Sequence, residues 1–122
     1  MRHAMANRDR LSEVERGVTV GTYYTTIDND PVKAIHAFQA VLELEPANQM
    51  ALDNLATLYE NQRQFGSAAE LYRRAIPFAA SKPDARASLV QALVRDDRVL
   101  EARRELDSLR TAYPNHPTTR WT

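Results

Sequence analysis

Cysteine is absent from this chain of 122 residues, and glycine occurs only three times. Without cysteine the chain can form neither disulfides nor thiolate metal sites, which suits a reducing compartment such as the cytoplasm. The glycines stand singly, at Gly17, Gly21 and Gly66, so the sequence contains no glycine-rich phosphate loop. No apolar run approaches the ~20 residues that a membrane-spanning helix needs. We therefore expect a cytoplasmic protein without a membrane partner.

An excess of charge is also missing, since Lys and Arg together number 16 and Asp and Glu together number 16. A chain without net charge has no overall field that would attract nucleic acid. The histidines, His3, His36 and His116, are too scattered for a metal motif. Residues 1–10 contain arginines but no apolar core behind them, so they do not resemble a signal peptide. We expect no nucleic acid partner, no metal and no cofactor.

Catalytic motifs are equally scarce. Neighbouring carboxylates that could act as acid and base occur as Glu43 with Glu45 and as Asp96 with Asp97. Each pair lies at or beside an expected helix end, where solvated charge is the simpler interpretation. No serine stands in a nucleophile-elbow sequence. The arginine pair at 73–74 stands among glutamates, which predicts ion pairs on a solvated helix face. The sequence therefore predicts a protein that is not an enzyme and has no small-molecule substrate.

What the chain does contain is a repeat with a step of 34 residues. Ala34, Ala68 and Ala102 fall at this spacing. The same step relates further apolar positions, namely Phe38, Tyr72 and Leu106; Val41, Ala75 and Leu109; and Leu55 and Leu89. A period of this length cannot come from a single helix or strand, so it indicates a repeated supersecondary unit.

Helix signals divide the chain into six helices, arranged in three pairs of antiparallel neighbours with short connections. Asp30 in front of Pro31 predicts the start of the second helix, and Asn48 is expected to cap the third. Ser81, with Asp84 three residues later, is expected to open the fifth helix.

Other residues predict where the later helices end and which way they face. Pro77 should cause a kink or an early end of the fourth helix, because it lacks a backbone donor and crowds the preceding turn. Turns are expected at residues 61–64 and 96–98, and Pro114 should close the sixth helix. The side chains of the sixth helix that we expect to face inward are Val99, Ala102, Leu106 and Leu109.

The first helix is the least regular of the six. Ser12 and Glu15 have the spacing of a capping box, so the helix is expected to start at Ser12 and to end near Ile27. Its stretch at residues 18–26 is rich in β-branched and aromatic residues, which alone would favour a strand. The register of the repeat requires a helix there, and we therefore predict one.

The middle repeat carries a recognisable pattern when it is started at Gln49. Its matching positions are Leu52, Leu55, Ala56, Tyr59, Phe65, Ala68, Tyr72 and Ala75. This pattern resembles the tetratricopeptide repeat, a helix–turn–helix unit of 34 residues. Repeats started at Glu15 and Pro83 match less closely, and the first has Gly21 at a position where leucine is usual. The resemblance implies an all-α fold, an α-solenoid of three such repeats that forms a right-handed superhelix.

The resemblance also implies a division of the chain. Residues 15–48 form a divergent first repeat, residues 49–82 the second and residues 83–116 the third. Residues 1–14 are expected to be the end of a preceding helix or an extension, and residues 117–122 a tail. Two other interpretations fit a helical chain: an unrelated helical bundle, and the pentatricopeptide repeat, which binds single-stranded RNA. The step of 34 and the zero net charge argue against the latter, whose period is one residue longer and whose members are usually basic.

Proteins of the tetratricopeptide class usually hold a partner peptide in a concave groove, along the first helix of each pair. The positions that this resemblance assigns to the groove are Tyr23, Met50, Asp53, Asn54, Thr57, Glu60, Asn61, Ser88, Gln91 and Arg95. Asn54 matches an asparagine that often holds the peptide backbone. Chaperone-binding members clamp a terminal carboxylate with basic residues, but here those positions hold Thr19, Asp84 and Ser88. Binding of chaperone tails is therefore not expected through that clamp.

Two functions remain open. The first is a non-enzymatic scaffold that binds a protein or peptide partner in the groove. The alternative is a structural module, or a fragment of a larger repeat protein such as a bacterial signalling protein, which packs or forms homo-oligomers through exposed end helices. Solenoids usually end in a polar terminal helix. The residues after Pro114 are too few for one, although Trp121 is placed to cover part of the exposed end.

Overall fold

The computed structural model describes residues 2–79 and 81–115, and throughout these residues all regular secondary structure is helical. Its elements are α1 (Arg2–Thr26), α2 (Pro31–Leu44), α3 (Gln49–Asn61), α4 (Phe65–Ala75), the 3-10 helix η1 (Ile76–Phe78), α5 (Lys82–Arg95) and α6 (Val99–Ala112). In this part of the chain no helix is long and apolar enough to span a membrane. His116 and Trp121 lie outside the described residues. The all-α prediction is confirmed.

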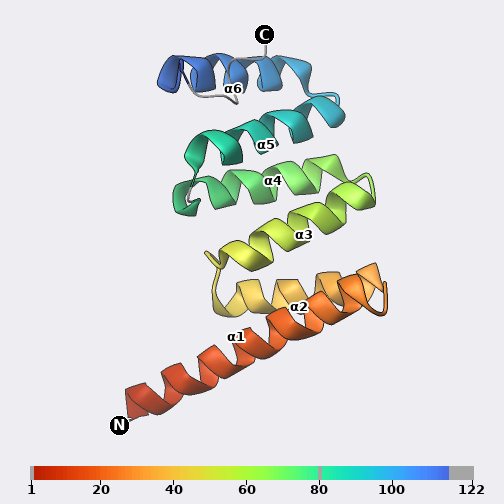
Figure 1. Cartoon of the computed structure of the whole chain (residues 1–122), viewed down its shortest axis with the longest axis vertical. Coiled ribbons are helices and arrows are strands. Elements are labelled where there is room, and N and C mark those ends of the chain that lie inside the picture. Colours follow the sequence, from red (N-terminus) through yellow and green to blue (C-terminus); the bar gives the residue numbers. More distant parts are fainter. Residues whose placement is uncertain (1, 80, 116–122) are drawn as a thin grey trace. The chain divides into compact units, whose positions relative to one another are not determined.

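The chain forms two compact units, residues 1–58 and residues 59–122, and the boundary falls within α3. In the first unit, α1 and α2 pack side by side as a helical hairpin (Figure 1). Their contact is close, because a Cβ added at Gly21 would lie 2.6 Å from Cζ of Phe38, and one added at Gly17 would lie 2.5 Å from Cγ2 of Val41. Gly21, the departure from the repeat pattern, therefore makes room for the fully buried Phe38 ring.

The β-prone stretch of the first helix is helical, as the repeat register predicted. Residues up to Thr26 belong to α1. The hydroxyl of Thr25 donates to the carbonyl oxygen of Gly21, and that of Thr26 to the carbonyl oxygen of Thr22, each at 2.8 Å. These bonds satisfy the hydroxyls within the helix, and packing against α2 outweighs the weak propensity. The predicted start at Ser12 is wrong, because α1 begins at Arg2 and Ser12 lies in its interior.

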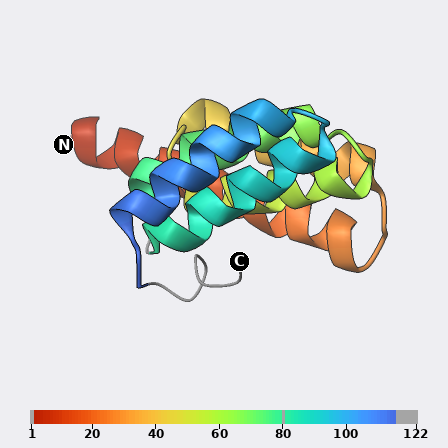
Figure 2. The same cartoon turned by 90° about the horizontal axis from the view of Figure 1, so that it is seen from above.

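In the second unit, α4, α5 and α6 lie side by side in sequence order (Figure 1), and Figure 2 looks onto α6 with α5 behind it. The core of this unit consists of Ala69, Leu89, Val90, Ala92, Leu93 and Ala102, flanked by Tyr72, Ile76 and Leu106. Leucines from α5 thus pack against alanines on α4 and α6, and these small side chains allow the helices to approach closely. Val99 was predicted to face inward and is 51% exposed, because it is the first residue of α6 and lies beside the turn.

Helix starts and ends follow mostly from the capping signals. Oδ1 of Asp30 accepts from the backbone N–H of Lys33 at 3.1 Å, and Oδ1 of Asn48 accepts from that of Ala51 at 2.9 Å, so both predicted caps are confirmed. The residue before α5 is Ser81, but its side chain makes no capping bond. The fifth helix nevertheless opens at Ser81 as predicted, and Pro83 lies in its first turn, where proline is tolerated.

Pro77 has the predicted effect on the fourth helix. The α-helical part of that segment ends at Ala75, and the chain continues as the 3-10 helix η1, which contains Pro77. Pro77 stands near the start of this 3-10 turn, where its missing backbone N–H is not needed for a hydrogen bond. The 3-10 turn tightens the end of the helix.

The step of 34 residues recurs in the backbone itself. Asn29, Arg63 and Asp97 are the non-glycine residues with positive φ among those described, at 49°, 61° and 63°. Each one lies in the turn between the two helices of a pair. The turns at Arg63 and Asp97 share a closing bond, from Gln64 N–H to the Tyr59 carbonyl and from Arg98 N–H to the Leu93 carbonyl. A left-handed residue ends many helices, and glycine or asparagine is usual there.

Arg63→Gly and Asp97→Gly are each expected to raise the free energy of unfolding, by a few tenths to about 1 kcal/mol. A left-handed conformation costs a side-chain-bearing residue roughly 1–2 kcal/mol, and glycine avoids most of this cost while losing more entropy on folding. Urea denaturation followed by circular dichroism measures the change. A clear loss of stability in both variants would show that these turns are not left-handed.

Candidate binding surface

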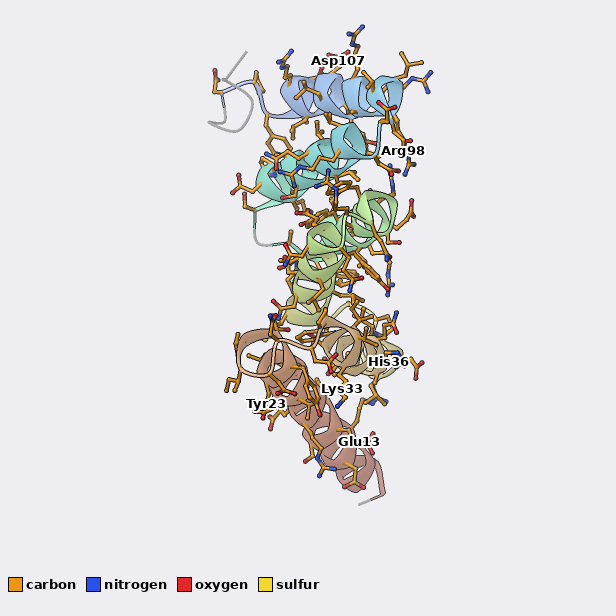
Figure 3. All side chains as sticks on the ribbon, turned by 90° about the vertical axis from the view of Figure 1, so that its right-hand side faces the viewer. Glu13, Tyr23, Lys33, His36, Arg98 and Asp107 are labelled. Atoms are coloured by element: carbon orange, nitrogen blue, oxygen red, sulfur yellow. The ribbon has the colours of Figure 1, made fainter. Side chains whose placement is uncertain are left out.

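The groove residues predicted in the first unit lie at accessible positions on α1 and α3. Tyr23, marked on α1 in Figure 3, and Met50 on α3 are exposed large side chains. On α3, Met50, Asp53, Asn54 and Thr57 follow a spacing of three, one and three residues, so they share one helix face. Asn54 is half-buried, while the other three side chains are exposed. A partner can therefore reach this face of α3.

Hydrogen bonds within the helix hold part of this face in place. Nε2 of Gln49 lies 3.1 and 3.3 Å from the two carboxylate oxygens of Asp53. The hydroxyl of Thr57 donates to the backbone carbonyl of Asp53 at 3.0 Å. Asp53 is thus oriented by its neighbour, which leaves the Asn54 amide and the Met50 side chain as the adaptable groups of this surface.

The groove residues predicted in the second unit meet more directly. Glu60 and Asn61, at the end of α3, and Arg95, at the end of α5, line one pocket of about 590 Å³. Arg63 and Phe65, from the turn and the first residue of α4, complete its lining. Ser88 and Gln91 lie on the α5 face that leads to Arg95, at a spacing of three and four residues. The structure thus brings together three of the predicted residues and adds two that the sequence analysis did not assign.

The charges in this pocket are arranged around Glu60. Its Oε1 accepts a hydrogen bond from the Tyr72 hydroxyl at 2.6 Å, and its Oε2 lies 3.3 Å from Nη1 of Arg95. The guanidinium carbons of Arg63 and Arg95 each lie 5.9 Å from the centre of the Phe65 ring. This distance is within the range of a cation–π contact. The pocket therefore presents an aromatic ring close to two cations.

Arg63 and Phe65 escaped the sequence analysis for different reasons. Phe65 was interpreted as a core residue of the fourth helix, and it is half-buried, with part of its surface in the pocket. Arg63 occupies a left-handed turn position, and the sequence has no glycine there that would have indicated this conformation. The available signal was the repeat itself, since Asn61 and Arg95 are one step apart and each is the last residue of the first helix of a pair.

A second hollow lies within the first unit, between α1 and α2. Its lining residues are Val20, Tyr24, Val32, Lys33, His36 and Ala37, and its volume is about 470 Å³. Lys33 and His36 are marked on α2 in Figure 3, and Nζ of Lys33 lies 5.4 Å from the centre of the Tyr24 ring. His36 is exposed, as predicted. Apart from these two polar side chains the hollow is apolar, so its chemistry differs from that of the other pocket.

Elsewhere the charged residues pair with one another. Arg73 on α4 lies 2.8 Å from Glu101 and 3.2 Å from Glu105, both on α6. This confirms the predicted ion pairing on a solvated face. The described part of the chain contains no group of His, Cys, Asp and Glu side chains that could hold a metal ion.

Solved structures with a similar fold are tetratricopeptide repeat (TPR) domains. One is the TPR domain of OM64 from Arabidopsis, with a TM-score of 0.67 and 17% sequence identity over 90% of this chain and 90% of that chain. Another is the second TPR domain of human RPAP3 in complex with the HSP70 peptide SGPTIEEVD, with a TM-score of 0.64 and 18% identity over 93% and 90% of the two chains. A third is the first TPR of Spaghetti (RPAP3) bound to the HSP90 peptide SRMEEVD, with a TM-score of 0.62 and 19% identity over 92% and 85%.

No protein-family model and no curated protein matches the sequence. The likeness to solved structures comes at identities below one fifth, so it shows the fold alone. The chain has the fold of TPR domains, as the pattern around Gln49 predicted.

Proposed function

We propose that this chain is a non-enzymatic interaction module that binds an extended peptide segment of a partner protein in the cytoplasm. The observation that carries the proposal is the pocket of Glu60, Asn61, Arg63, Phe65 and Arg95, of which Glu60, Asn61 and Arg95 were expected to face a peptide. Two of the similar domains are bound to peptides, which supports a peptide as the ligand. A few polar groups around an aromatic side chain can fix the orientation of a bound segment.

The predicted groove residues outside the pocket are the second part of this proposal. Tyr23, Met50 and Gln91 offer exposed side-chain surface, and Asn54 offers an amide that both donates and accepts. Such residues bind a peptide by contact area and by hydrogen bonds to its backbone, so they provide affinity with little sequence preference.

Replacing Tyr23 and Asn54 together by alanine is expected to weaken peptide binding about tenfold, because an aromatic contact and an amide pair are lost. A random peptide library displayed on phage supplies the ligands, and fluorescence anisotropy of selected synthetic peptides measures their affinity. The helical circular dichroism signal should stay unchanged, since neither side chain is buried.

The matched control for this experiment is Asp107→Ala with Thr111→Ala. Both residues are exposed on α6, outside the predicted groove. Equal affinity of the Tyr23/Asn54 variant and this control would discard the assignment of Tyr23 and Asn54 to the binding surface. Failure of the unmodified chain to enrich any peptide would reject the proposed function itself.

A second proposal is self-association through the end helices. The apolar hollow between α1 and α2 favours it, together with Val32 in the lining of that hollow and Leu100 on α6, which are 60% and 71% exposed. A second copy of the chain is the occupant we propose, because the same chain offers both a hollow and protruding apolar side chains. Such complementary patches on one chain make a head-to-tail contact.

Light scattering across a concentration series tests self-association. The mass should rise above the 13.9 kDa of one chain as the concentration increases. Val32→Lys should keep the chain monomeric, because it places a charge in the apolar contact. A strict monomer at every concentration would contradict this proposal and leave peptide binding as the sole function proposed.

A further inference from the structure

We propose that the pocket of Arg63, Phe65 and Arg95 binds a carboxylate side chain, Glu or Asp, of the partner peptide. This inference rests on the proposed function, and it adds the chemistry of the partner and a binding subsite at the turn between α3 and α4. The basic residues that hold a terminal carboxylate in chaperone-binding TPR domains are replaced here by Thr19, Asp84 and Ser88. The proposed subsite lies at other repeat positions.

The first argument concerns charge. Of the ionisable residues that line the pocket, Arg63 and Arg95 are positive and Glu60 is negative, so the pocket has one positive charge in excess. Glu60 is already engaged on both of its oxygens, by the Tyr72 hydroxyl and by Arg95. The nearby Asp96 lies 3.7 Å from Nη1 of Arg98 and is not part of the lining. The uncompensated charge belongs to Arg63.

The second argument concerns the donors. Across the described residues no carboxylate lies within ion-pair distance of Arg63, whose contact in the pocket is the face of the Phe65 ring. A guanidinium group has five N–H donors in one plane, and a contact with an aromatic ring does not use them as a carboxylate would. Arg95 is exposed and reaches Glu60 through a single nitrogen, so further donors remain on it as well. Asn61 adds an amide to the lining.

The third argument concerns the backbone of Arg63. Its φ of 61° is a conformation that glycine and asparagine adopt readily and that a long side chain adopts only at a cost. Asn29 and Asp97 share this conformation one repeat before and one repeat after, so it belongs to these turns, and what is particular to Arg63 is its long cationic side chain. At this turn the Arg63 guanidinium lies at the Phe65 ring, which Arg95 also approaches.

A carboxylate side chain fits these features better than the other groups that a peptide can offer. Two cations repel lysine and arginine, and an apolar side chain would desolvate the Arg63 guanidinium without offering it an acceptor. A carboxylate can accept two N–H donors at once, and the methylene groups that carry it can lie against the Phe65 ring.

The experiment uses the phage library selected on the unmodified chain. We expect enrichment of peptides with at least one Glu or Asp at a fixed position. Synthetic versions with Gln or Asn at that position should bind about tenfold more weakly, whereas amidation of the terminal carboxylate should leave the affinity unchanged. The binding should also weaken as the salt concentration rises.

Arg63→Gly is the decisive variant, because glycine is favoured in this turn and the chain should remain folded. It is expected to lower the affinity for the acidic peptides about tenfold and to abolish the difference between Glu and Gln versions. Asp97→Gly is the matched control, since Asp97 occupies the same turn position one repeat later and lies outside the pocket. It should retain the full preference for Glu.

The outcomes separate this inference from the proposed function. Peptides that lack an acidic residue and bind Arg63→Gly as tightly as the unmodified chain would overturn the subsite while leaving peptide binding intact. Sensitivity to amidation alone would also overturn it, because the carboxylate recognised would then be the terminal one. If no peptide is enriched, the proposed function fails, and this inference fails with it.

Discussion

Gly21→Ala is expected to lower the free energy of unfolding by about 2 kcal/mol, although alanine is the better helix former. The gain in helix propensity is roughly 1 kcal/mol. Against it stands the added Cβ, which would lie 2.6 to 2.8 Å from three atoms of the Phe38 ring. That ring is 0% exposed, so it has no free space into which it can move. Overpacking of a buried site typically costs about 1–3 kcal/mol, and a clash with three rigid atoms belongs at the upper end.

Gly66→Ala is the matched control for this prediction. A Cβ at Gly66 would approach Oδ2 of Asp96 at 3.0 Å, which is the end of a flexible and half-buried side chain. The carboxylate can turn away, so the gain in propensity should dominate, and the stability should stay equal or rise by up to about 1 kcal/mol.

The contact itself can be tested by rescue. Phe38→Leu removes ring atoms from the site, so the loss caused by Gly21→Ala should be smaller when both substitutions are present. Urea denaturation of the four variants forms a complete cycle. If Gly21→Ala is as stable as the unmodified chain, the close contact between Gly21 of α1 and Phe38 of α2 is wrong.

Ala68→Leu is expected to lower the free energy of unfolding by about 3 kcal/mol. Ala68 is 0% exposed and stands in the column of alanines, with Ala34 and Ala102, which are likewise buried. A leucine adds three carbon atoms where the site has no exposed surface, so the helices must move apart or adopt strained rotamers.

Its matched control is Ser67→Leu, at the adjacent and exposed position of α4. Leucine at an exposed helical position changes stability by no more than about 0.5 kcal/mol. Thermal denaturation followed by circular dichroism compares the two variants. Equal melting temperatures would mean that the alanine column does not mark close helix crossings.

Much of this fold could be predicted from the sequence because its determinants are local or periodic. Asp30, Asn48 and Pro77 act on their own helix ends, so their effects depend on nothing far away in the chain. The first helix was a different case. Its residues favour a strand, and only the register of the repeat predicted the helix that packing against α2 stabilises.

The errors came from features that local signals do not determine. Ser81 precedes α5 as predicted, but its side chain makes no capping bond. Val99 follows the apolar spacing of its helix, but it is the first residue of α6 and lies at the exposed turn, outside the core. Ser12 shows the spacing of a capping box within a helix that has already begun.

The candidate site was predictable only in part, because it depends on which helix ends and turns lie close together in the folded chain. The repeat pattern pointed to Glu60, Asn61 and Arg95, which line one pocket. Arg63 and Phe65 could not be assigned to that pocket from their types. An arginine in a turn is ordinary, and its left-handed backbone becomes visible only in three dimensions.

The most direct test of the proposed peptide-binding function is nuclear magnetic resonance mapping of the whole chain. The chain, labelled with nitrogen-15, is titrated with an amidated acidic peptide selected from the library. We predict the largest shifts at the amides of residues 60–65 and 91–95 and at the Nε–Hε groups of Arg63 and Arg95. Saturable shifts that instead gather around Val20 and Val32, or the absence of any shift near Arg63 and Arg95, would contradict this account.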